Sequence, residues 1–194
     1  MFEDISYPDF NRDDVAICHE IGHLVVWFLY GEPVDKMTIR RSAMDGALEP
    51  HVALGITKDL LCDDYAERLA ERWLAGESAA RKVLNMRRNR ISTKTFLVTS
   101  QSDLPALLSH MDDREDFARV LWAAHKKATE GWYVWIRERL NQANTMVDTH
   151  WGVIQRIAAS LQPRLPAAGQ EVIISEAELT TVLRHEGITS PLKQ

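Results

Sequence analysis

The sequence predicts a mainly α-helical fold with a minor β component, in which a helical bundle lies beside a small β-hairpin or sheet. Residues 11–30, 63–84 and 132–142 read as helices. β-type residues gather in two short runs, 34–40 and 52–57, on either side of a loop that contains Asp45-Gly46. The chain has 194 residues and suits a single domain over 1–194 that buries its core without disulfides.

The first helix is predicted over Asn11 to Tyr30. Asn11 is a favoured N-cap residue, and Asp14 stands three residues later in a capping-box-like position. Gly31 follows in the position of a left-handed C-cap, and Pro33 prevents the helix from continuing. Most of the circumference is apolar, so we expect this helix to be packed on several sides.

The motif His19-Glu20-Ile21-Gly22-His23 lies inside this helix. Residues four apart share one helix face, so both imidazoles can bind one zinc ion while Glu20 reaches its water. Such a water has a pKa near 7, and Glu20 is the candidate to take its proton and pass it to the leaving amine. The alternative, a coincidental pair of histidines on a core helix, buries polar groups at a cost without a metal. We expect His19 and His23 to be buried.

A catalytic zinc site uses three protein ligands, so the sequence must supply one more. The metzincin pattern requires a glycine and a third histidine further along the helix, but Val26 and Leu29 occupy these positions. That class of peptidase is therefore excluded. The residues alone leave four carboxylates open as the third ligand: Glu67, Glu71 and Glu77 on the second helix, and Asp103 in the segment 99–105.

The segments 16–23, 33–39 and 53–57 resemble, in order and spacing, the peptidase domain of the FtsH family of zinc proteases. The run Leu74-Ala75-Gly76-Glu77-Ser78-Ala79-Ala80 is similar to a small-residue pattern that opens a later helix of that family. The resemblance implies one zinc ion per chain, bound by His19, His23 and Asp103, with Glu20 as the catalytic residue. It covers a zinc-site half, residues 1–110, and more weakly a C-terminal helical half, residues 111–194.

The same resemblance implies a binding mode for substrate. In the family, substrate is thought to lie extended along a sheet edge beside the zinc, and the matching residues here are Val52, Ala53, Leu54, Gly55 and Ile56. Pairing of this kind gives affinity through backbone hydrogen bonds and tolerates many sequences. Gly55 would allow a close approach of the two backbones.

Members of the FtsH family usually carry a membrane anchor and an AAA+ ATPase module with a phosphate-binding loop, and neither pattern occurs in this sequence. The expectation is therefore an ATP-independent zinc endopeptidase that acts on peptides or unfolded proteins. A separate ATPase partner and an oligomer are both compatible with the resemblance. The alternative is a catalytically silent FtsH-like interaction or regulatory module, which would work with a separate unfoldase.

Composition and charge limit the kinds of binding partner and the cellular compartment that we expect. The net charge of −5 argues against nucleic acid as a principal partner. The apolar run 24–30 is far shorter than a membrane span, and the N-terminus lacks the basic region of a signal peptide, so no membrane association is expected. Cys18 and Cys62 form no disulfide framework, which favours a reducing cytoplasm.

The C-terminal half shows fewer signals. Residues 128–161 resemble the long helices of the FtsH family. Residues 161–170, which contain two prolines and a glycine, are predicted to form a loop. Ser175 followed by Glu178 is the pattern of a capping box that opens the last helix.

Overall fold

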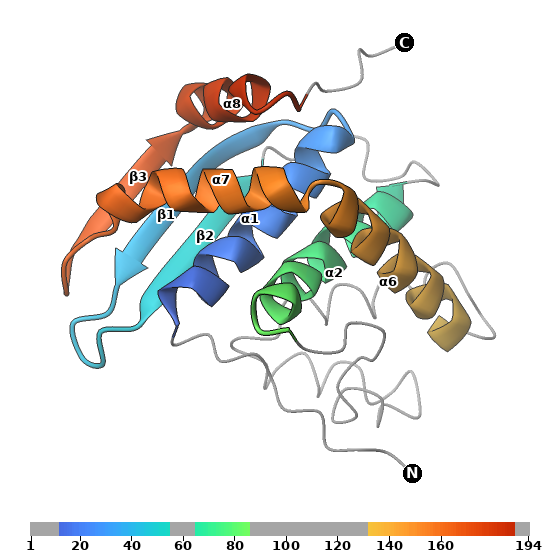
Figure 1. Ribbon diagram of the computed structural model, residues 1–194, viewed down its shortest axis with the longest axis horizontal. Helices are drawn as coiled ribbons and strands as arrows, with labels where there is room; N and C mark the ends of the chain where they lie inside the picture. The colour runs from blue at the N-terminus through green and yellow to red at the C-terminus, as the bar shows by residue number, and fades with distance from the viewer. Residues whose placement is uncertain (1–11, 55–64, 86–131, 189–194) are drawn as a thin grey trace.

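The computed structural model describes residues 12–54, 65–85 and 132–188 of the chain. Over these residues the fold is mainly helical with one three-stranded antiparallel sheet, which confirms the predicted fold class (Figure 1). In chain order the elements are α1 (Asp13–Leu29), β1 (Val34–Arg41), β2 (Leu48–Leu54), α2 (Tyr65–Val83), α6 (Trp132–Thr149), α7 (Trp151–Leu161), a 3-10 turn (Gln162–Arg164), β3 (Glu171–Ser175) and α8 (Glu176–His185).

Helix α1 lies at the centre of the described fold. It contacts β2 on one side and α2 on the other, while α7 crosses over it (Figure 1). Twelve of its residues, including Ile17, Ile21 and Trp27, are buried. This confirms the prediction that the helix is packed on several sides. A helix in such a position holds its side chains in fixed places relative to both neighbours.

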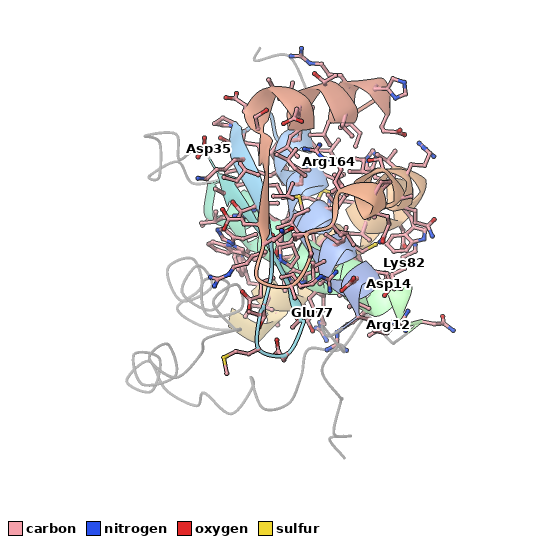
Figure 2. All side chains as sticks on the ribbon, turned by 90° about the vertical axis from the view of Figure 1, so that its left-hand side faces the viewer. Arg12, Asp14, Asp35, Glu77, Lys82 and Arg164 are labelled. Carbon is pink, nitrogen blue, oxygen red and sulfur yellow. The ribbon has the colours of Figure 1, made fainter. Side chains whose placement is uncertain are left out.

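The two ends of α1 differ in how well the sequence predicted them. The expected N-cap at Asn11 is wrong: the helix begins at Asp13 and its N-cap is Arg12, whose side chain makes no capping hydrogen bond. Arg12 instead pairs with Asp14 at 2.6 Å, and both lie at this end of the helix (Figure 2). At the other end Gly31 has a φ of 73°, the left-handed conformation that its position after the helix predicted.

The sheet has the strand order β2-β1-β3. The first strand agrees with the prediction, whereas β2 begins at Leu48 and not at Val52. Pro50 therefore lies inside a strand, opposite Ile39 of β1. A proline is tolerated there because β2 is an edge strand in the described sheet, so a nitrogen without hydrogen can face away from β1.

A two-stranded or three-stranded sheet was expected, but the position of the third strand was not predicted. Residues 171–175 pair with β1 in an antiparallel register in which Ile174 lies opposite Met37. Both of these side chains are buried in the core below the sheet. Since β3 comes from the C-terminal half and β1 from the N-terminal half, the sheet joins the two. Ser175 then opens α8, and its reciprocal hydrogen bonds with Glu178 confirm the predicted capping box.

The helices on the far side of α1 follow the predicted pattern with one interruption. The predicted helical stretch 128–161 contains α6 and α7, which are separated at His150. Helix α6 packs on α2, and α7 packs on α1. None of the helices in the described ranges is long and apolar enough to cross a membrane.

Candidate metal centre

His19 and His23 face each other on α1. Their Nε2 atoms are 2.9 Å apart, and the two rings are nearly perpendicular at 88°. Two zinc–nitrogen bonds of about 2.0–2.1 Å at a tetrahedral angle would separate such nitrogens by about 3.3 Å. A shift of a few tenths of an ångström therefore converts this pair into a chelating pair. His23 is buried, as predicted, with 2% of its surface exposed, whereas His19 is only partly buried.

The protonation of His23 is determined by its neighbour on α2. Its Nδ1 atom lies 2.8 Å from the backbone carbonyl oxygen of Arg72. A carbonyl oxygen can only accept a hydrogen bond, so Nδ1 carries the proton. In the neutral ring Nε2 is then unprotonated and accepts a hydrogen bond of 2.9 Å from His19 Nε2. Contacts of this type, in which the second ring nitrogen is bound by a backbone carbonyl, orient metal-binding histidines in general.

Glu20 contacts the strand beside the helix. Its Oε2 atom accepts a hydrogen bond of 2.9 Å from the backbone N–H of Val52. Alternate residues of an antiparallel strand direct their backbone groups to opposite edges. The N–H of Val52, like the nitrogen of Pro50, therefore points away from β1 and toward the outer edge of β2. The carboxylate of Glu20 thus lies at the edge strand.

These three side chains form a compact group. One ligand atom from each of His19, Glu20 and His23 lies within 4.8 Å of the others, and no further cluster of this kind occurs among the residues that the structure describes. The group contains the predicted catalytic residue and two of the three predicted metal ligands. Asp103, the third predicted ligand, lies outside the described residues.

The three alternative carboxylates on α2 are bonded elsewhere. Glu77 pairs with Arg81 at 2.6 Å, while Glu67 and Glu71 pair with Arg139 of α6 at 2.8 and 2.9 Å. None of the three belongs to the group around His19 and His23. The position of these glutamates gives no support to a third ligand from α2.

Glu71 also belongs to a buried polar network that the sequence did not reveal. The hydroxyl of Tyr30, at the end of α1, donates a hydrogen bond to Glu71 Oε2. Burial raises the pKa of the Glu71 carboxyl, while the Tyr30 hydrogen bond and the Arg139 guanidinium lower it. Burial and the same hydrogen bond raise the pKa of Tyr30 above its ordinary value. Through these residues the network connects α1, α2 and α6.

The predicted substrate strand is described in part. Val52, Ala53 and Leu54 are the last residues of β2, and Gly55 and Ile56 lie outside the described residues. Val52 is buried with 2% exposure in the same hydrophobic core as the apolar residues of α1, while its backbone N–H bonds to Glu20. The strand and the metal-binding group therefore meet at the contact between Val52 and Glu20.

Compared with known proteins, the chain matches no model of a protein family and no curated protein sequence.

Proposed function

We propose that the protein is a zinc-dependent, ATP-independent endopeptidase that hydrolyses peptide bonds in peptides or unfolded proteins. The observation that carries the proposal is the pair of Nε2 atoms of His19 and His23, which face each other at 2.9 Å while the Arg72 carbonyl orients the His23 ring through Nδ1. Two imidazoles four residues apart on one helix are metal donors of catalytic zinc sites, and the carboxylate beside them is placed to act as the base. The residues therefore fit the metal.

His19 and His23 would hold the zinc ion, with Asp103 as the proposed third ligand. When bound, zinc polarises a carbonyl oxygen and lowers the pKa of water to about 7. Glu20 is the neighbouring carboxylate and would accept a proton from water and deliver it to the departing amine. Its hydrogen bond to Val52 would hold the carboxylate at the strand edge, where the peptide bond must lie.

The edge of β2 supports an extended peptide as the substrate. The backbone groups of Val52 face away from β1, and a peptide that adds to this edge would be held by main-chain hydrogen bonds. Pro50 has no N–H and the N–H of Val52 is bound by Glu20, so the proposed pairing would use the Val52 carbonyl and continue toward Gly55 and Ile56. Recognition of backbone and not of side chains suits peptides and unfolded chains, and folded substrates would require a separate unfoldase.

The decisive experiment compares the wild-type protein with Glu20→Gln. The amide oxygen of glutamine can still accept the hydrogen bond from Val52, so the strand contact is retained while the base is removed. We expect one zinc per chain in both proteins and a loss of casein hydrolysis of about 100-fold or more in the variant. Wild-type hydrolysis should also stop when a chelator is added and return with zinc.

Glu49→Gln is the matched control, because this residue lies on the same strand with its side chain exposed. It should hydrolyse casein at the wild-type rate. Hydrolysis retained by Glu20→Gln would refute the assignment of the base. Stoichiometric zinc without cleavage of any unfolded substrate by the wild-type protein would instead favour the silent interaction or regulatory module.

A further inference from the structure

Gly76 of α2 lies against the ring of His23, one of the two proposed metal ligands on α1. A Cβ atom at this position would be 2.2 Å from His23 Cε1, 2.3 Å from Nε2 and 2.8 Å from Nδ1. Cβ atoms in proteins essentially never approach another heavy atom to less than 3.0 Å. No side chain larger than hydrogen therefore fits at residue 76 while the imidazole is in this place.

The same turn of α2 both admits and orients the ring. Arg72, whose carbonyl oxygen binds His23 Nδ1, precedes Gly76 by four residues and so lies on the same helix face. The ring is held at 2.8 Å on one atom by this carbonyl and faces His19 at 2.9 Å on the other. A Cβ at residue 76 can be accommodated only if the ring leaves one of these two contacts or the helices separate.

We propose that Gly76 is a positioning residue of the metal centre: its missing side chain provides the space that lets His23 direct Nε2 toward the metal. This inference rests on the proposed zinc function. Gly76 neither binds the metal nor touches substrate. It acts through His23, and its replacement should weaken metal binding by misplacing one ligand.

Gly22 offers a matched comparison at the same interface. A Cβ at Gly22 would be 2.7 Å from the carbonyl oxygen of Ala75 and 2.9 Å from the Cβ of Ala79, so it would press on α2 itself. Gly152 of α7 is a second comparison, because a Cβ there would meet only the end of the Arg156 side chain, at 3.3 Å. Gly22→Ala thus shows the effect of disturbed packing between α1 and α2. Gly152→Ala shows the effect of replacing a helical glycine by alanine where only a flexible side chain is nearby.

The first experiment measures zinc affinity by competition with a chromophoric chelator. Changes that disturb the support of a metal ligand typically lower metal affinity by about 10–100-fold, and we expect a loss in this range for Gly76→Ala. Gly152→Ala should bind zinc like the wild type. In the metal-free proteins, ¹⁵N chemical shifts of the imidazoles should show His23 protonated on Nδ1 in the wild type and changed in Gly76→Ala.

The second experiment is a double-mutant cycle on the metal-free protein, read as the melting temperature. Gly76→Ala should lower the melting temperature when His23 is present. In a His23→Ala background the same change should be neutral or raise it, since the ring is gone and alanine favours a helix more than glycine does. Gly22→Ala should lower the melting temperature in both backgrounds. The cycle therefore remains informative if Gly76→Ala alone does not fold.

The outcomes separate this inference from the proposed function. A wild-type protein that binds no zinc would refute the proposed function. A wild-type protein that binds zinc together with a Gly76→Ala variant of equal affinity would refute only the role of Gly76. An equal loss of melting temperature in the presence and absence of His23 would likewise overturn it, because Gly76 would then serve helix packing alone.

Discussion

Replacement of Arg139 by methionine tests the buried network that joins α1, α2 and α6. Arg139 Nη1 lies 2.9 Å from Glu71 Oε1, and the hydroxyl of Tyr30 donates to the other oxygen of the same carboxylate. The side chain of Glu71 is 4% exposed and that of Arg139 is 22% exposed. Methionine retains the apolar stem and removes the charge, so a carboxylate remains buried without its cation.

The removal of one partner from a fully buried ion pair typically costs about 3–5 kcal/mol. The cost should be smaller here for two reasons. Arg139 is partly exposed, and Tyr30 continues to donate its hydrogen bond to Glu71. We therefore expect the free energy of unfolding to fall by about 2–3 kcal/mol at pH 8.

The pH dependence follows from the carboxyl group. Burial raises the pKa of Glu71, and Arg139 opposes this effect, so the variant should have a still higher pKa in the folded state. A group with a raised folded-state pKa contributes stability that is fully present below its unfolded pKa and is lost as pH rises through the folded pKa. The difference between the variant and the wild type should therefore be largest at pH 8 and much smaller at pH 5.

Urea unfolding of the metal-free proteins at pH 5 and pH 8 measures this difference, with chelator present because bound zinc would add stability. Arg156→Met is the control, since Arg156 is 59% exposed in its pair with Glu186 and its removal should change little. An equal loss for Arg139→Met at the two pH values would show that the buried charge is not the cause.

Two further predictions concern the metal ligands and the buried cysteine. Asp103→Ala should sharply lower zinc affinity. Glu77→Gln, which alters a carboxylate bonded to Arg81, should leave zinc affinity unchanged. A loss of affinity in Glu77→Gln but not in Asp103→Ala would mean that the third ligand lies on α2. Burial raises the pKa of the Cys18 thiol to about 11, so a Cys62→Ser variant should resist iodoacetamide at pH 8 until it is unfolded. Rapid alkylation of that folded variant would mean that α1 is readily exposed.

The sequence predicted the elements that depend on local signals. Helix α1 is apolar over most of its circumference and is followed by a glycine, and both are local signals that do not depend on distant contacts. Its N-cap was misjudged by one residue, because the preference for asparagine at this position is only statistical and Arg12 takes the position. The capping box at Ser175 is also local and was predicted correctly.

Elements that depend on distant contacts were predicted less well. Pro50 reads as a break in a strand, and it is tolerated because its nitrogen faces the outer edge of the sheet. Residues 171–175 are too few to specify a strand, and they form one because β1 offers a free edge more than 100 residues earlier in the chain. Neither fact can be read from the residues in isolation.

The candidate site shows the same division. The side chains of His19, Glu20 and His23 were evident as a motif, but the groups that orient them were not. His23 is held by a backbone carbonyl at Arg72, and Glu20 is held by a backbone N–H at Val52. Every residue except proline carries both backbone groups, so such contacts leave no mark on residue type. Of the residues that orient the site, only Gly76 is recognisable from its residue type, because it is a glycine within a helix.

The central position of α1 has a consequence for the synthesis of the protein. α1 is made early, yet α7, which crosses over it, begins at Trp151, about 120 residues after α1 ends at Leu29. At about 5–20 residues per second, ribosomes leave part of this apolar helix uncovered for roughly 6–24 s in every nascent chain. Newly made protein should therefore depend on chaperones that shield apolar segments, and a synonymous slowing of translation between α1 and α7 should increase its aggregation.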